Sequence, residues 1–207
     1  CKFKPRSYQV EGVYDALRHN RKLLISPTAS GKSLMIYSIV RYFVEKGKNT
    51  LIVVPTTSLV EQMYKDFSDY GWDVGSFCHK IYAGKERETD SQVIITTWQS
   101  IYKLPRKYFE RFSVVIGDEA HQFKSKSLVS IMTKLADAKY RYGFTGTLDG
   151  TQTHKWVLEG LFGPSYKIIK TEELMKKGHV ATLDINVLLL KHTPNKFETF
   201  EDEIQYI

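Results

Sequence analysis

The chain has 207 residues, of which 42% are hydrophobic and 26% charged, a composition typical of a globular protein with one buried core. No apolar run approaches the roughly 20 residues that span a bilayer, and the two cysteines, Cys1 and Cys78, cannot build a disulfide framework, so we expect a reduced, cytoplasmic setting without membrane contact. The formal net charge of +7 suits a polyanionic partner such as nucleic acid, although a solvated basic surface explains it equally well.

Five short apolar runs alternate with longer amphipathic stretches. The runs are too short and too continuous to be surface helices, so they predict buried strands of a mostly parallel sheet. They cover residues 23–25, 50–54, 93–97, 113–116 and 142–145. Helical periodicity is found at residues 33–45, 58–70 and 128–136. This alternation predicts βαβ units and therefore an α/β fold in three layers, with residues 184–190 compatible with one more strand.

A loop with the sequence Ser-Pro-Thr-Ala-Ser-Gly-Lys-Ser joins the first predicted strand to the first predicted helix. Backbone N–H groups and a helix N-terminus favour a phosphate at such a place. Gly31 lets the backbone approach the phosphates, Lys32 can reach the β- and γ-phosphates, and the Ser33 hydroxyl can ligate Mg²⁺. Ser26 departs from the usual Gly or Ala, but it is small enough to keep the turn. The predicted nucleotide-binding residues of the loop are Thr28, Ala29, Ser30, Gly31, Lys32 and Ser33.

Two adjacent carboxylates end the strand predicted at residues 113–116, in the sequence Gly-Asp-Glu-Ala-His. Parallel sheets bind ligands at this end of their strands. Asp118 is placed to hold Mg²⁺, and Glu119 to orient and deprotonate an attacking water. Acidic residues at a helix N-terminus would explain a lone Asp-Glu pair. The complete Asp-Glu-Ala-His sequence downstream of a phosphate loop favours catalysis instead.

These motifs, in this order, resemble the first RecA-like domain of DEAH-box-type helicases of superfamily II over nearly the whole chain. The resemblance implies a RecA-like P-loop NTPase domain that binds ATP and Mg²⁺. The catalytic residues that it implies are Lys32, Asp118, Glu119 and His121. Phe-Thr-Gly-Thr at residues 144–147 stands where the family's third motif usually reads Ser-Ala-Thr. By the same resemblance Thr145 and Thr147 couple with His121 and link hydrolysis to strand movement, although Thr-Gly-Thr alone is more often a turn.

Arg-Ser-Tyr-Gln at residues 6–9 resembles the family's upstream nucleotide motif. In that motif an aromatic ring stacks on adenine and a Gln reads the edge of the base. The resemblance therefore assigns Arg6, Tyr8 and Gln9 to the nucleotide site. For Tyr8, a buried position in an amphipathic helix remains the alternative.

Two more segments match the family's nucleic-acid motifs, because each follows a predicted strand and opens a helix. Hydroxyl and N–H groups there can contact backbone phosphates. Helix capping by Ser or Thr is the simpler explanation of each segment alone, but two such loops beside an ATP site favour phosphate binding. Trp98 either stacks on a base or anchors its loop in the core. The predicted contact residues are Pro55, Thr56, Thr57, Thr96, Thr97, Trp98 and Gln99.

A closer resemblance links the chain to bacteriophage recombination helicases that unwind branched DNA and migrate junctions. It is carried by residues 55–59, 97–99, 147–150 and 174–180. We therefore expect an ATP-dependent DNA helicase or translocase of recombination, repair or replication restart, in the cytoplasm of a bacterial host. An RNA helicase and a double-stranded DNA translocase of a restriction-type motor remain open, since the motifs imply backbone contacts. Alternatives of another class are a P-loop kinase and a non-catalytic, ATP-liganded nucleic-acid-binding module.

We expect residues 1–170 to form the ATP-binding domain, and residues 171–207 to connect it to a second RecA-like domain that is missing here. Nothing after residue 150 resembles the arginine motifs of such a second domain. The chain also opens with Cys1 rather than Met, which suggests that the native protein begins upstream. A helicase needs both domains, so these residues alone are predicted to be inactive in unwinding.

Overall fold

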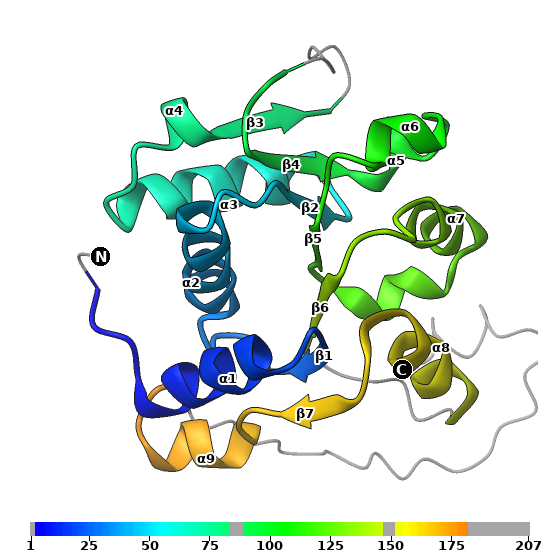
Figure 1. Ribbon diagram of the computed structural model, residues 1–207. Coiled ribbons are helices and arrows are strands. Elements are labelled where there is room, and N and C mark those ends of the chain that lie inside the picture. Colours follow the sequence, from blue (N-terminus) through cyan, green and yellow to red (C-terminus); the bar gives the residue numbers. More distant parts are fainter. Residues whose placement is uncertain (1–2, 83–88, 147–151, 182–207) are drawn as a thin grey trace, which may run out of the picture.

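A parallel β-sheet forms the middle layer of the computed structural model, which describes residues 3–82, 89–146 and 152–181 (Figure 1). Seven described strands pair in the order β3-β4-β2-β5-β6-β1-β7, and every pair is parallel. The strands are β1 (Arg21–Ile25), β2 (Thr50–Val54), β3 (Cys78–Ile81), β4 (Val93–Thr97), β5 (Val114–Gly117), β6 (Tyr140–Thr145) and β7 (Ser165–Lys167). The predicted α/β fold with a mostly parallel sheet is confirmed.

The five predicted strands are all present, and β2 and β4 have the predicted bounds. Both are buried at every position, which explains their continuous apolar sequences. The sequence did not predict β3 and β7, which are the two edges of the sheet. Both edge strands are partly exposed, so they carry no uninterrupted apolar run.

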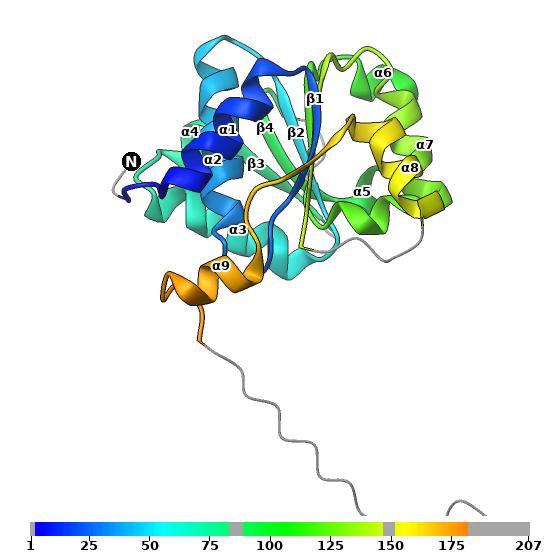
Figure 2. The same cartoon turned by 90° about the horizontal axis from the view of Figure 1, so that it is seen from below.

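Helices cover both faces of the sheet (Figure 2). On one face lie α1 (Ser7–Arg18), α2 (Lys32–Glu45), α3 (Thr57–Asp69) and α4 (Val74–Phe77). On the other lie α5 (Trp98–Ile101), α6 (Arg106–Phe109), the 3₁₀ helix η1 (Ala120–Lys124), α7 (Lys126–Lys134) and α8 (Gln152–Phe162). The short helix α9 (Thr171–Lys176) follows β7. The three predicted helices correspond to α2, α3 and α7, and the three-layer arrangement is confirmed.

The core is divided by the sheet into two clusters, one on each face. Neighbouring strand residues point to opposite faces, so Leu24 belongs to the cluster under α2 and Leu23 to the cluster under α8. Gly143 in β6 is required by close packing, because an added Cβ would lie 2.8 Å from Cγ of Phe162. α8 therefore lies directly against the sheet.

All the parallel strands end at the same edge of the sheet. The loops after β4, β2, β5, β6 and β1 follow one another along this edge in that order. The two predicted nucleic-acid loops are therefore neighbours, and the predicted catalytic loops lie beside them. Thr147 and residues 184–190 are outside the described residues. Within the described ranges no helix is long and apolar enough to cross a membrane.

Candidate functional site

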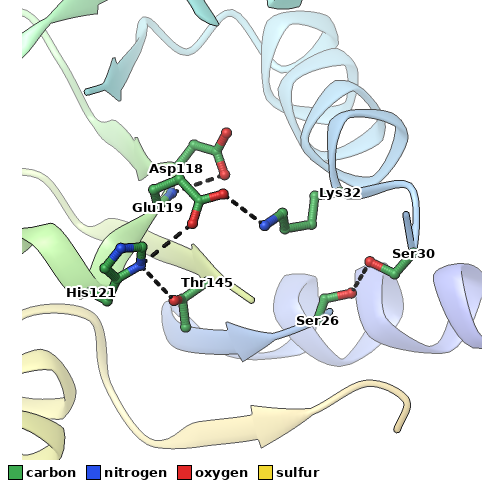
Figure 3. A network of polar contacts seen from close by, with 7 residues as sticks. All are labelled: Ser26, Ser30, Lys32, Asp118, Glu119, His121 and Thr145. Carbon is green, nitrogen blue, oxygen red and sulfur yellow. Dashed lines mark hydrogen bonds and ion pairs between the residues drawn. The ribbon is translucent and has the colours of Figure 1, made fainter. Parts of the chain in front are cut away.

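The loop between β1 and α2 is held in shape at Ser30 (Figure 3). Ser26 Oγ donates a hydrogen bond of 2.5 Å to Ser30 Oγ, and both residues are fully buried. The Ser30 carbonyl accepts hydrogen bonds from Tyr8 OH at 3.0 Å and from Gln9 Nε2 at 2.8 Å. The side chain at Ser26, where the family has Gly or Ala, thus helps to order the loop before any ligand binds.

The backbone of this loop is left-handed at two positions, Ala29 with φ of 63° and Gly31 with φ of 80°. Left-handed turns create concave sets of N–H groups that bind anions. A Cβ added to Gly31 would lie 2.3 Å from Gln9 Nε2, so that side chain would have to shift, and the positive φ favours glycine independently. Lys32 follows as the first residue of α2. The loop therefore has two left-handed residues directly before α2, a backbone geometry that is compatible with anion binding.

Asp118 comes directly after β5 and is 7% exposed. Its Oδ1 accepts a hydrogen bond of 3.0 Å from the Glu119 N–H. Burial raises the pKa of Asp118 to about 6, an effect that Lys32 opposes and the Glu119 charge reinforces.

Glu119 has φ of 49° and ψ of 51°, a left-handed conformation that costs a non-glycine residue about 1–2 kcal/mol. Its Oε1 accepts a hydrogen bond of 2.9 Å from Lys32 Nζ, and its Oε2 lies 3.4 Å from His121 Nδ1. Backbone strain of this kind is concentrated at functional sites. Residues predicted from two separate motifs, Lys32 and Glu119, thus form one ion pair in front of the phosphate loop (Figure 3).

His121 lies within η1 and connects the segment after β5, which carries Asp118 and Glu119, to the end of β6. His121 Nδ1 is 3.1 Å from Thr145 Oγ1, which is the contact that the family resemblance implied. On α8, His154 Nε2 lies 2.9 Å from the His121 carbonyl. No sequence motif pointed to His154, and Thr147 falls outside the described residues.

Tyr8 and Gln9 contact the phosphate loop and Arg6 contacts both of them, but the Tyr8 ring is not presented to a base. Tyr8 is 5% exposed and packs in a cluster with Ile169 and Leu174. Its hydroxyl accepts a hydrogen bond of 2.8 Å from Arg6 Nη1. Gln9 is also 5% exposed, and its Oε1 accepts the Arg6 N–H at 2.8 Å. The alternative of a buried tyrosine on an amphipathic helix is therefore correct, and stacking of Tyr8 on adenine is not supported.

Two oxygen ligands of the kind that Mg²⁺ prefers are available from the motifs, the Asp118 carboxylate and the Ser33 hydroxyl. Mg²⁺ usually takes few protein ligands and completes its shell with phosphates and water. Among the described residues, no group of three His, Cys, Asp or Glu side chains that could hold a metal ion is present. Ser33 Oγ lies 2.8 Å from Tyr70 OH, a partner that the sequence did not reveal.

A cavity of about 390 Å³ opens in front of the phosphate loop. The loop and the catalytic motifs supply most of its lining, and the segment around α9 supplies the rest. The lining residues are Pro27, Thr28, Ala29, Lys32, Glu119, Gly146, Thr171 and Val180. The cavity therefore brings Lys32 and Glu119, from the two predicted motifs, together with a segment that was not predicted to belong to the site.

The loops after β2 and β4 lie next to each other, as their motifs predicted. Gln99 Nε2 donates to the Pro55 carbonyl at 3.5 Å. Thr56 caps α3, since its Oγ1 accepts the Leu59 N–H at 3.3 Å, yet Thr56 and Thr57 remain exposed. Capping and exposure therefore coexist in the first loop, and its hydroxyl groups can be reached by a ligand.

The second loop differs from its prediction at two residues. Thr96 is fully buried, and its hydroxyl donates to the Ile81 carbonyl at 2.8 Å, so this side chain is not available to a phosphate. Thr97 is also buried, with Oγ1 2.9 Å from Ser100 Oγ. Trp98 packs edge-on against Tyr102, at 5.9 Å between ring centres, and borders the core. Trp98 is therefore a loop anchor rather than an exposed stacking platform.

Known proteins are similar to this chain in both sequence and fold. Residues 2–150 match the family described as type III restriction enzyme, res subunit. The ATP-dependent DNA helicase uvsW of Enterobacteria phage T4 is 34% identical over 217 residues, covering 100% of this chain and 43% of the relative. The DNA 3'-5' translocase XPB2 of Sulfurisphaera tokodaii is 29% identical, covering 97% of this chain and 43% of the relative. The crystal structure of UvsW from bacteriophage T4 superposes with a TM-score of 0.73 and 33% identity, covering 80% of this chain and 60% of that one.

The chain thus spans less than half the length of these two relatives. The resemblance to superfamily II helicases, and to a phage recombination helicase among them, is confirmed by these matches. The fold agrees, since the UvsW structure superposes on most of the chain. The chain belongs to the family of the type III restriction enzyme res subunit, and it is a first motor domain of superfamily II helicases.

Proposed function

We propose that the chain is the ATP-hydrolysing domain of a DNA helicase or translocase. The observation that carries this proposal is the ion pair between Lys32 and Glu119 at 2.9 Å, which lies beside Asp118 at the mouth of a preformed phosphate loop. With Lys32 on a phosphate, Asp118 on a metal ion and Glu119 as the base, these residues would supply the groups that phosphoryl transfer to water uses. Two loops with exposed polar side chains, Thr56 and Thr57 in one and Gln99 in the other, lie along the same end of the sheet.

Each residue of the site receives a role in this proposal. Lys32 contacts the β- and γ-phosphates, and Asp118 and Ser33 hold Mg²⁺, which neutralises phosphate charge when bound. Glu119 orients the attacking water and accepts its proton. In the structure Lys32 neutralises Glu119, so a γ-phosphate that attracts Lys32 would free the carboxylate for the water. His121 and Thr145 would carry the change at the γ-phosphate to β6.

The partners follow from the same geometry and from the relatives. A motor that unwinds nucleic acid closes around ATP with a second domain, whose arginine finger is worth about 10³–10⁵ in rate. We propose that a second RecA-like domain follows this one in the same protein, after the connecting residues 171–207, because the chain spans 43% of the uvsW relative. Exposed groups at Thr56, Thr57 and Gln99 would contact backbone phosphates of DNA, branched DNA in recombination or repair being the preferred substrate. A phage protein of this kind would act in the host cytoplasm.

An ATPase assay of the full-length protein, with and without DNA, tests the proposal. We expect turnover that DNA stimulates, and an E119Q variant that binds ATP but has lost turnover. Turnover unaffected by either DNA or RNA would indicate a phosphotransferase. Binding without turnover would indicate a passive module, and stimulation by RNA alone would replace DNA as the substrate. Wild-type turnover by E119Q would remove Glu119 from its role.

A further inference from the structure

The segment after β7 folds back onto α1, next to the phosphate loop. Leu174 of α9 is fully buried and Ile169 is 4% exposed, and both pack in one cluster with Tyr8. Ile168 packs closely too, since a Cβ added to Gly12 of α1 would lie 3.1 Å from Ile168 Cδ1. This small cluster is separate from the two clusters that fill the faces of the sheet. α9 is therefore attached to the nucleotide motif on α1 rather than to the sheet.

The same segment also borders the cavity in front of the phosphate loop. Thr171, the first residue of α9, and Val180, four residues beyond its end, line this cavity together with Lys32 and Glu119. Thr171 is exposed and offers a hydroxyl group, whereas Val180 is partly buried and packs against the cluster around Tyr8. A ligand that fills the cavity would therefore contact the first residue of α9 and a residue just beyond its end.

Tyr8 connects the packing of α9 on α1 with the phosphate loop. Its ring is covered by Leu174 and Ile169, and its hydroxyl donates to the Ser30 carbonyl at 3.0 Å. Ser30 in turn immediately precedes Gly31, where the backbone adopts the left-handed conformation of the phosphate loop. A displacement of α9 would therefore move Tyr8, one of the residues that hold the phosphate loop at Ser30.

We propose that residues 168–180 form a wall of the nucleotide site, so that a nucleoside triphosphate is bound jointly by the phosphate loop and by this segment. Tyr8 is the positioning residue between them. The inference rests on the proposed function in one respect, the identity of the ligand as ATP. Because coupling between two equilibria is reciprocal, ATP stabilises the packing of α9 on α1 to the same extent that this packing strengthens ATP binding.

Equilibrium binding of a non-hydrolysable ATP analogue with Mg²⁺ to the full-length protein tests the wall. Leu174→Ala removes the anchor of α9, and we expect about five- to tenfold weaker binding. Leu174→Met, which keeps most of the volume, should restore affinity to within about twofold. Leu135→Ala is the matched control, because Leu135 is 1% exposed in the cluster on the other face of the sheet. It should lose stability without losing affinity.

Two further measurements distinguish a direct effect of this segment on ATP binding from a general loss of protein stability. Tyr8→Phe keeps the buried ring and removes the hydrogen bond to Ser30, so we expect about two- to tenfold weaker binding. In the wild-type protein, the analogue should slow hydrogen exchange of the α9 amides several-fold while leaving those of α7 unchanged. Unchanged exchange in α9, or equal losses of affinity in Leu174→Ala and Leu135→Ala, would overturn the inference.

The outcomes also distinguish this inference from the proposed function. If Lys32→Ala loses binding but Leu174→Ala binds like the wild type, the proposed ATP site is supported and the proposed role of residues 168–180 is wrong. If the wild-type protein fails to bind the analogue, both proposals fall together.

Discussion

Two halves of one sheet edge are built differently. On one half, the loops after β1, β5 and β6 are bonded to one another: Ser26 N–H donates to the Thr145 carbonyl at 2.8 Å, and Lys32 pairs with Glu119 at 2.9 Å. On the other half, the loops after β2 and β4 present exposed side chains, and the bond that joins them, from Gln99 to Pro55, is 3.5 Å long.

This difference matches the two kinds of ligand that we propose. Chemistry at a phosphoryl group depends on a few atoms in fixed positions, which requires preorganisation. Contact with a repeating phosphate backbone is spread over many weak and equivalent groups. Single substitutions should therefore have large effects on the first half and small, additive effects on the second.

Lys32→Ala gives the largest expected effect. It removes the cation that faces the transferred phosphoryl group, and loss of one such group costs about 10²–10³ or more in kcat. Steady-state ATPase measurements on the full-length protein test this. Lys48→Ala is the control, since Lys48 is an exposed residue after α2 and should leave kcat unchanged. A Lys32→Ala enzyme with more than a tenth of the wild-type rate would contradict the preorganised site.

Gly31→Ala comes next, because it combines backbone strain with a clash. The new Cβ would lie 2.3 Å from Gln9 Nε2 in a residue with φ of 80°. We expect ATP affinity to fall at least about tenfold, since more than 1.4 kcal/mol is at stake. Gly47 has φ of 67° with nothing within 4 Å of an added Cβ, which makes Gly47→Ala a control for strain alone. Gly47→Ala should lower the unfolding free energy by about 1–2 kcal/mol and keep ATP affinity.

Ser26→Ala sharpens the comparison on a smaller scale. It breaks the hydrogen bond to Ser30 Oγ, which is 2.5 Å long and fully buried. A hydrogen bond of this kind contributes about 0.5–1.5 kcal/mol, so ATP affinity should fall about two- to tenfold. Titration calorimetry measures the ATP affinity of the variant and of the wild type. Affinity equal to that of the wild type would mean that the loop keeps its shape without Ser26.

Thr57→Ala and Gln99→Ala should have the smallest effects, about twofold each on DNA affinity and additive in the double variant. Binding should not depend on base sequence, and 3–5 phosphate contacts on a single strand predict a log–log salt slope of about −2 to −3.5. Fluorescence anisotropy over a salt series measures the slope. A slope near zero, or strong preference for one sequence, would remove the backbone-contact account.

The sequence predicted the interior strands of the sheet from their apolar runs, and it placed Lys32 and Glu119 in one site because both follow the carboxyl ends of parallel strands. It did not predict that these two side chains form an ion pair. It did not predict β3 and β7, since partly exposed edge strands lack such runs. The prediction that Thr96 contacts phosphate was wrong, because its hydroxyl bonds the Ile81 carbonyl. Successive strand residues face opposite sides of a sheet, so Thr96 and Thr97 could not both have pointed to the same face.

The environment of Tyr8 could not be predicted from sequence. Its ring is covered by Leu174, a residue far along the chain that carries no local signal of the contact. The partner of Ser33, Tyr70 at the end of α3, depends in the same way on how two helices pack. Motif order identifies which residues meet at a strand end, whereas burial depends on packing between distant elements.

We propose that these residues hold one half of an ATP site and need a second domain for hydrolysis and unwinding. The most direct test is a comparison of the isolated chain, residues 1–207, with the full-length protein at saturating ATP and DNA. We expect the isolated chain to bind ATP weakly and to show neither DNA-stimulated ATPase nor unwinding, while the full-length protein shows both. Strand separation by the isolated chain would contradict the account, because the active site would then be complete within it.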